Sequence, residues 1–203
     1  MAATFTFPLW QPILEHRGPA AVEAFPGLDP QLQPGFVSLP QEQQRAYLDF
    51  AQQDRTKALA MVTAALAQRV PVPTDEQAMP DLNAPVTVAS GTFQKISAVL
   101  WGQGTINIYQ DASNALTMRF DSFSMPNGPD LHLYLTAADA PKTSADMSAN
   151  GVDKLDLGAL KSSYGSQNYA LTDVSDLTQY RSVVIYSSSL DLIYTYAPLF
   201  VRQ

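Results

Sequence analysis

Residues 125–135 read MPNGPDLHLYL, a proline-rich turn that runs directly into an alternating strand. The two prolines fix φ, Gly128 permits a positive φ, and the polar residues beside them can bond nearby backbone groups, so we predict a structural turn. In the strand, the leucines at 131, 133 and 135 share one face, and His132 and Tyr134 share the other. We predict that the leucines face an interior, while His132 and Tyr134 face outward or lie beneath the N-terminal part of the chain.

Short apolar segments alternate with turn residues throughout residues 84–203. Turns such as GQG, DASNA and SANG, spaced by short strands, favour a sandwich or barrel over a parallel α/β sheet. We therefore predict a mainly β fold, an antiparallel β-sandwich. If the strands at 115–124 and 131–137 pair as a hairpin, Asp121 or Arg119 comes close to His132. The predicted strands are Val86–Ser90, Gly91–Leu100, Gly104–Gln110, Ala115–Ser124, Leu131–Ala137, Lys154–Leu157, Tyr169–Thr172, Ser182–Ser188 and Leu190–Tyr196.

Residues 1–83 are predicted to be a proline-rich, partly helical extension and linker. Prolines interrupt the first 38 residues and leave room only for a short helix near Gly18–Ala24. Ser38 is predicted to cap one helix and Asp54 a second, and the second has a single apolar stripe. The linker VPVPTDEQAMPDLNAP at 70–85 contains four prolines, so we place the domain boundary at 83/84. The stripe consists of Ala58, Met61, Val62, Ala65 and Leu66.

The composition excludes several classes of protein. The chain has 203 residues, 46% of them hydrophobic, which is enough for a core, and a formal net charge of -7 without a basic stripe. We therefore predict no nucleic-acid partner. There is no cysteine, which excludes disulfides, thiolate metal sites and cysteine nucleophiles. The start, MAATFTFPLW, lacks a signal-peptide pattern, and no apolar run is long enough for a transmembrane segment.

Three phrases carry a family resemblance: FDSFSMPNGPDLHLYL at 120–135, LDLGALKSSYGSQNYAL at 155–171 and YRSVVIYSSSLDLIYTYAPL at 180–199. In this order they resemble the DM-thirteen domain, a β-sandwich module related to DOMON domains, and the similarity extends over about residues 91–199. The resemblance implies a redox or electron-transfer role outside the cytoplasm. The segment LWQPILEHRGPAAVEAFPGL at 9–28 is similar to one that precedes this domain in bacterial envelope proteins. We therefore expect a location in the bacterial cell envelope or periplasm, with the leader or anchor absent from this chain.

The sequence departs from the family at two positions. The electron-transfer idea for the family depends on a cysteine in the strand that matches VVIYSSS, and here that position is Ser187. A serine hydroxyl has no accessible redox couple, so the cysteine-based mechanism cannot operate at this position. The strand that contains Trp101 often carries a histidine in relatives, and ISAVLWGQG has none.

Without cysteine, a transition-metal site needs imidazole, carboxylate, phenol or thioether ligands. The candidate ligands are His132, Asp121, Met125 and Asp130, with copper as the redox metal expected for such a set. His16 is the other histidine and would join only if the N-terminal segment folds back. The strand tyrosines are interpreted as packing residues rather than radical relays.

Three functional hypotheses remain open. The first is an extracytoplasmic redox or electron-transfer module of the cell envelope, without the family cysteine. The second is a copper-binding antioxidant protein of the superoxide-dismutase type centred on His132, which would make the chain a copper-dependent oxidoreductase. The third is a non-catalytic interaction domain that binds envelope partners through its N-terminal extension. No hydrolase elbow, phosphate loop or dinucleotide motif indicates another enzyme class.

Overall fold

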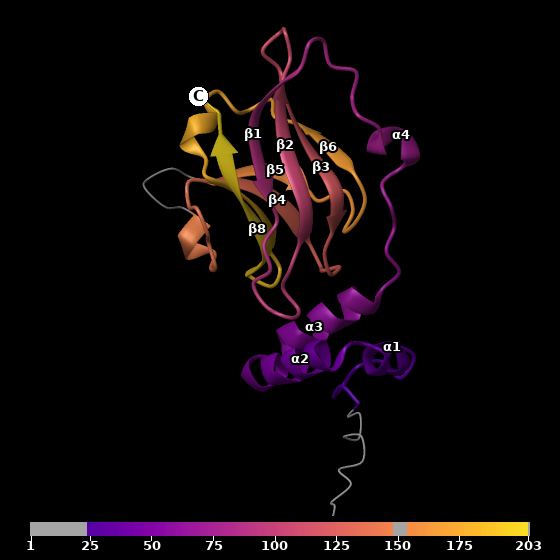
Figure 1. Ribbon diagram of the computed structural model, residues 1–203. Coiled ribbons are helices and arrows are strands. Elements are labelled where there is room, and N and C mark those ends of the chain that lie inside the picture. Colours follow the sequence, from indigo (N-terminus) through magenta and orange to yellow (C-terminus); the bar gives the residue numbers. More distant parts are fainter. Residues whose placement is uncertain (1–23, 148–153, 203) are drawn as a thin grey trace, which may run out of the picture.

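The computed structural model describes residues 24–147 and 154–202, and the dominant element is a strongly curved antiparallel sheet (Figure 1). Its strands lie in the order β5-β4-β7-β8-β1-β2-β3-β6, and the sheet curls until it is nearly barrel-shaped. The predicted class, mainly antiparallel β with a partly helical N-terminal region, is confirmed. The strands are β1 Val86–Thr92, β2 Gln103–Gln110, β3 Leu116–Ser124, β4 Leu131–Thr136, β5 Leu155–Ala159, β6 Gln167–Ala170, β7 Ser182–Ser187 and β8 Leu192–Val201.

Strand β8 joins the two halves of the sheet. Its first part pairs with β7, and its last residues pair with β1 through Ala89↔Val201, Ser90↔Phe200 and Gly91↔Leu199. Gly91 sits at this corner because a Cβ there would lie 2.5 Å from the backbone oxygen of Pro198. The two predicted sandwich layers are therefore continuous with each other through one shared strand.

The strand predicted at Gly91–Leu100 is wrong beyond Thr92. The next residues form a loop because the amides of Ile96 and Ser97 both donate to the Leu100 carbonyl, which closes a local turn. The Ser97 hydroxyl also accepts from the amides of Val99 and Leu100. A serine side chain that bonds the backbone in this way competes with strand pairing.

The interior of the barrel is apolar, as the alternation in residues 131–135 predicts. Leu131, Leu133 and Leu135 are all buried in the main core. Inside the barrel the Phe93, Phe120 and Phe123 rings pack with centroids 4.8 to 5.1 Å apart. Aromatic pairs at this separation add to the stability that area burial provides.

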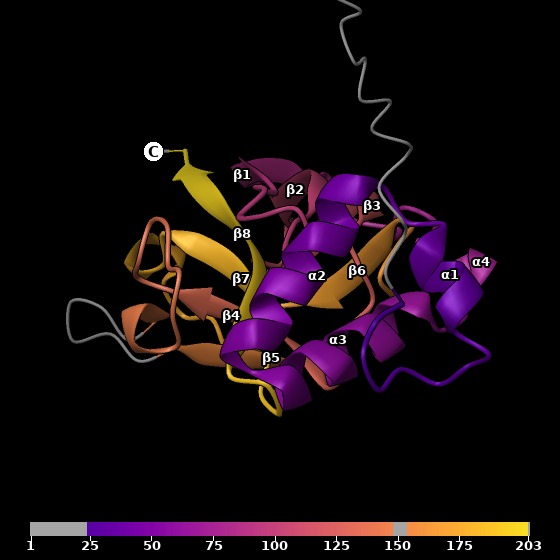
Figure 2. The same cartoon turned by 90° about the horizontal axis from the view of Figure 1, so that it is seen from below.

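Two helices cover one end of the barrel (Figure 2). Asp54 caps the second of them as predicted, since its carboxylate accepts from the amide of Lys57 at 2.9 Å. The cap predicted at Ser38 is wrong: Ser38 ends the preceding short helix, and its hydroxyl donates to the carbonyl of Pro34. The helix predicted at 18–24 falls outside the described residues except for its last position. The helices are α1 Gln33–Val37, α2 Gln41–Gln53, α3 Arg55–Leu66 and α4 Thr74–Gln77.

The helices and the sheet share one apolar core. Tyr47 of α2 and Met61 of α3 belong to the same buried cluster as the barrel interior. After α3 the chain continues as an extended segment, residues 68–85, which we call the strap. The strap contains the short helix α4 and runs beside the sheet to the start of β1 (Figure 1). The domain boundary at 83/84 stays a prediction. Within the described residues no helix has the length and apolarity to cross a membrane.

Candidate functional site

The proline-rich turn at 125–130 carries the chain from one half of the sheet to the other. β3 pairs with β2 and β6, whereas β4 pairs with β5 and β7. The strands at 115–124 and 131–137 therefore do not pair as a hairpin, and the approach of Asp121 or Arg119 to His132 that such pairing would give does not occur, because the turn crosses the end of the barrel instead of reversing within one layer. Gly128 does not have the positive φ that the sequence suggested; the left-handed residue is Asp130, with φ 49°. Gly128 is needed for another reason, since a Cβ there would lie 2.5 Å from Tyr194 Cζ.

His132, at the start of β4, lies between two carboxylates. Its Nδ1 is 3.1 Å from Oδ2 of Asp156 on β5, and its Nε2 is 3.7 Å from Oδ1 of Asp130. The Ser188 hydroxyl donates to the other oxygen of Asp130. When the neutral ring donates its Nδ1 proton to Asp156, Nε2 holds the lone pair and faces Asp130. Carboxylates that hold metal-binding histidines act in this way.

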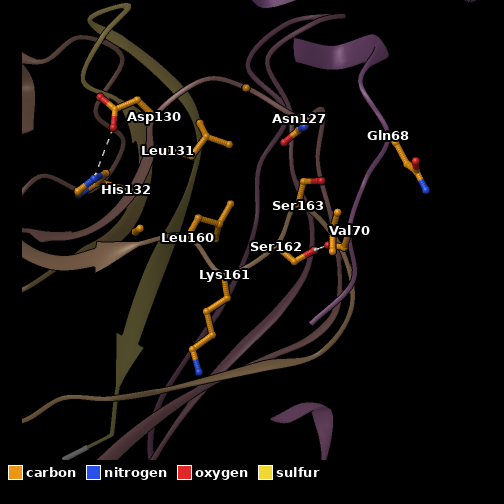
Figure 3. Close-up of a pocket in the computed structure, with 12 residues that line it drawn as sticks. Gln68, Val70, Asn127, Asp130, Leu131, His132, Leu160, Lys161, Ser162 and Ser163 are labelled. Atoms are coloured by element: carbon orange, nitrogen blue, oxygen red, sulfur yellow. Dashed lines mark hydrogen bonds and ion pairs between the residues drawn. The ribbon is translucent and has the colours of Figure 1, made fainter. Parts of the chain in front are cut away.

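A cavity of about 330 Å³ lies beside Asp130 and His132. Figure 3 shows its lining, in which the turn, the β5–β6 connection and the strap come together. Ser162, on the β5–β6 connection, donates to the carbonyl of Val70 in the strap at 2.7 Å. The cavity is therefore bounded by segments far apart in the sequence, and His132 and Asp130 are its ionisable residues on the β4 side.

The structure brings two of the four predicted metal ligands together. Asp130 and His132 are neighbours, but the Asp121 carboxylate is bound at 2.7 Å by Nε of Arg119 on β3. Met125 is fully buried, and its carbonyl accepts from Arg69. In the ranges 24–147 and 154–202 no three His, Asp or Glu side chains form a group that could hold a metal ion. His16 lies outside the described residues.

Sequence reasoning did not find Asp156 as a partner of His132. The two residues are 24 positions apart, and they meet because β4 and β5 pair with a bulge between His132↔Ala159 and Tyr134↔Asp156. A bulge changes which side chains lie opposite each other. The alternation of LDLG could have placed Asp156 on an outer face, but no sequence signal fixed the register.

Ser187, the residue that the resemblance places at the family cysteine, is fully buried at the end of β7. Its hydroxyl donates to the carbonyl of Pro129 at 2.7 Å. The side chain thereby holds the turn against β7, which is a structural role for a hydroxyl. Trp101 lies in the loop before β2 rather than in a strand.

The outer face of β4 and β7 carries a second aromatic cluster. Tyr134 and Tyr186 pack edge to face with centroids 5.8 Å apart, and both are only 8% exposed. The Lys154 ammonium lies 5.3 Å from the first ring centroid and 5.2 Å from the second. The Tyr186 hydroxyl donates to Oδ1 of Asp191 at 2.8 Å. Burial, followed by the neighbouring Asp156, raises the pKa of Tyr134 to about 12.

Comparison with known families identifies the domain. The family model described as Electron transfer DM13 matches residues 92–199. This chain belongs to the DM13 family. The match covers β1 from its last residue through most of β8, so the DM13 region includes His132, Ser187 and the outer tyrosines. No curated protein and no solved structure matches the chain.

Proposed function

We propose that this chain is an extracytoplasmic electron-transfer module of the bacterial cell envelope that works without the family cysteine. The observation that supports it is the DM13 match over residues 92–199; the family resemblance places Ser187 at the position of the family cysteine. Since Ser187 is buried and bonded to Pro129, electron transfer must use other groups of the domain. The solvent-facing sides of the helices at the barrel end offer surfaces for envelope partners.

A second candidate function, copper binding with antioxidant activity, is favoured by the arrangement around His132. Nε2 of His132 and Oδ1 of Asp130 are 3.7 Å apart, close enough for one ion bonded to each at about 2 Å. Asp156 would orient the imidazole from behind, as carboxylates do for metal-bound histidines. The residues fit a two-ligand site completed by solvent, without Asp121 and Met125, and the bound metal would supply the one-electron couple.

One preparation tests both functions: untagged protein isolated from its own cells after separation of envelope, periplasm and cytoplasm. For the wild type we expect recovery outside the cytoplasm and one-electron exchange with a soluble redox mediator. A cytoplasmic protein that exchanges no electrons would overturn the electron-transfer proposal. Copper added back should bind near one equivalent in the wild type, and His132→Gln, which removes a direct ligand, should weaken binding by more than the roughly 10- to 100-fold that loss of a supporting carboxylate costs.

Two further variants locate the copper site. Asp130→Asn should weaken binding as His132→Gln does, because both remove a ligand. Asp121→Asn is the matched control, since its carboxylate faces Arg119 rather than His132. If all three variants keep wild-type copper affinity, the metal does not bind between Asp130 and His132.

A further inference from the structure

The outer face of β4 and β7 holds two phenols, each beside a carboxylate. Tyr186 donates to Oδ1 of Asp191 at 2.8 Å, and Tyr134 lies opposite Asp156 in the pairing of β4 with β5. Hydrogen bonds from Ser144 and then Tyr186 lower the pKa of Asp191, so its carboxylate is ionised and free to accept a proton at neutral pH. A phenol loses its proton when it loses an electron, and a bonded carboxylate receives that proton without solvent rearrangement.

The rings are close enough to exchange an electron. Their centroids are 5.8 Å apart with an interplanar angle of 80°, and the His132 ring stacks near Tyr134 at 6.3 Å. Both phenols are shielded from water, which keeps two radicals on different molecules from meeting. The buried cluster is completed by three apolar neighbours: Met147, Val184 and Ile193.

The position of Lys154 disfavours oxidation of the tyrosines to radical cations. Its ammonium lies over both ring faces, at 5.3 Å from Tyr134 and 5.2 Å from Tyr186. A fixed positive charge over an aromatic face opposes the formation of a radical cation, because it would repel the new charge. Oxidation is therefore favoured only when the phenolic proton leaves together with the electron, and Asp191 is positioned to receive it.

We propose that Tyr186 and Tyr134 form a redox-active pair that passes single electrons, with Asp191 as the proton acceptor of Tyr186. This inference rests on the proposed electron-transfer function and names the groups that perform it. The oxidant is an oxygen-centred radical of the peroxyl class. One electron leaves Tyr186 for the peroxyl radical, which takes a proton from water, becomes a hydroperoxide and leaves a hydroxide ion in the solvent. The Oη–H bond of Tyr186 breaks, and its proton moves to Oδ1 of Asp191.

The second step transfers the radical to the neighbouring ring. Tyr186 takes an electron from Tyr134 and regains its proton from Asp191, while the phenolic proton of Tyr134 moves to Asp156. After this step Tyr186 is a neutral phenol again, Tyr134 is the neutral radical and Asp156 carries its proton, and no further reactant is needed for the transfer. The unpaired electron therefore stays on one of these two buried tyrosines rather than on an exposed tyrosine.

Flash oxidation tests the pair. A photo-oxidised ruthenium tris-bipyridine complex, with persulfate as the electron acceptor, removes one electron from the purified chain. Electron paramagnetic resonance and transient absorption then follow the tyrosyl radical. We expect a long-lived radical in the wild type that is lost in Tyr186→Phe and in Tyr134→Phe. Asp191→Asn should slow radical formation by about tenfold and remove its solvent isotope effect, since it removes one charged hydrogen-bond acceptor.

Conservative controls separate redox chemistry from packing. Asp191→Glu keeps a carboxylate and should restore the rate, and Tyr180→Phe, outside the cluster, should leave the signal unchanged. An unchanged radical signal in Tyr186→Phe, together with an unchanged rate of radical formation in Asp191→Asn, would overturn the pair. If those variants still exchange electrons with the mediator used above, the tyrosine pair is wrong and the electron-transfer function stands. If the wild type exchanges none, the proposed function itself is wrong.

Discussion

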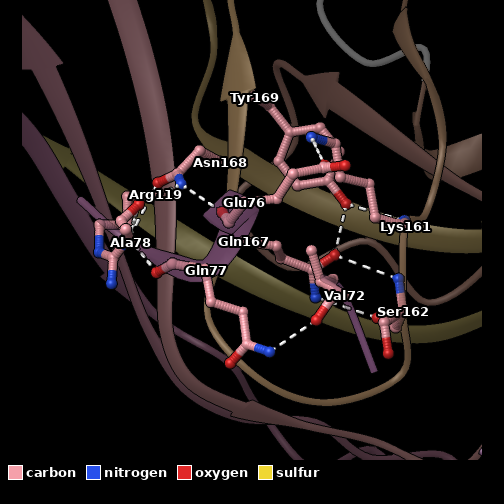
Figure 4. Close-up of polar contacts among 10 residues, drawn as sticks. All are labelled: Val72, Glu76, Gln77, Ala78, Arg119, Lys161, Ser162, Gln167, Asn168 and Tyr169. Atoms are coloured by element: carbon pink, nitrogen blue, oxygen red, sulfur yellow. Dashed lines mark hydrogen bonds and ion pairs between the residues drawn. The ribbon is translucent and has the colours of Figure 1, made fainter. Parts of the chain in front are cut away.

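The outer faces of the two halves of the sheet use polar side chains for different purposes. On β3 and β6, Arg119 and Asn168 donate to strap carbonyls, and Asn168 reaches those of Glu76 and Ala78 at 2.8 Å each (Figure 4). On β4 and β7, the polar atoms of His132 and Tyr186 face carboxylates instead. Backbone carbonyls do not change charge, whereas phenols, imidazoles and carboxylates exchange protons. The first face is therefore built to hold a chain segment, and the second has groups that can react.

On the strap face, the Asp121 carboxylate is paired with Arg119 rather than with His132. That carboxylate neutralises Arg119, whose other nitrogen reaches the carbonyls of Gln77 and Ala78 at 3.1 and 3.2 Å. An arginine that is paired and mostly enclosed needs a carboxylate nearby. The Asp121 carboxylate, which the sequence suggested as a metal ligand, instead holds the Arg119 guanidinium that binds the strap.

Among changes to the strap contacts, we expect the largest loss of stability from replacing Arg69. Its guanidinium donates to the carbonyls of Met125 and Ser163 and to the hydroxyls of Ser124 and Ser163. Arg69→Met leaves these acceptors without a partner, and we expect the free energy of unfolding in urea to fall by about 2–3 kcal/mol. Arg45→Met, on the exposed side of α2, is the control and should change it by less than about 0.5 kcal/mol. Equal losses in both variants would contradict a specific role for Arg69.

Arg119→Met should have a smaller and more local effect. It frees two strap carbonyls and leaves Asp121 unpaired at a partly exposed position, so we expect a loss of about 1–2 kcal/mol. The loss should appear first as faster proteolysis within residues 70–85, before global unfolding. If proteolysis of the strap is unchanged, its attachment depends on the other contacts alone.

Alkaline pH should affect the tyrosine face. Burial raises the pKa of Tyr134 to about 12, so the folded state holds this proton more tightly than the unfolded state, whose tyrosines titrate near 10. The resulting stability is complete below about pH 10 and is lost as pH rises toward 12, by roughly 2–3 kcal/mol for this ring. Tyr134→Phe should give a flatter pH dependence in urea unfolding. An equally steep loss in that variant would assign the effect to other buried tyrosines.

Local patterns in the sequence predicted local structure well. The leucine alternation at 131–135 gave the buried face of β4, and Asp54 before an apolar stripe gave the start of α3. The strand predicted at Gly91–Leu100 was wrong beyond Thr92 because Ser97 closes a turn that competes with strand pairing. Such side-chain to backbone bonds depend on a conformation that the residue pattern does not encode.

The candidate site required long-range information. Asp130 and His132 were predicted together because they are two residues apart, and they remained together in the fold. Asp156 was missed because a bulge sets its register with β4, and Tyr186 meets Asp191 only through the reversal between β7 and β8. The partners of a side chain across a sheet follow from strand order, which this sequence leaves open.

The shared strand β8 also has a consequence for how the chain folds. β7 and β8 are neighbours in sequence and can pair early, but β8 meets β1 only after the whole intervening chain has been arranged. Closing so large a loop for three residue pairs carries an entropic cost before any contact compensates for it. The junction at Gly91 is thus the step we expect to limit the folding rate, and Gly91→Ala should slow refolding more than it speeds unfolding.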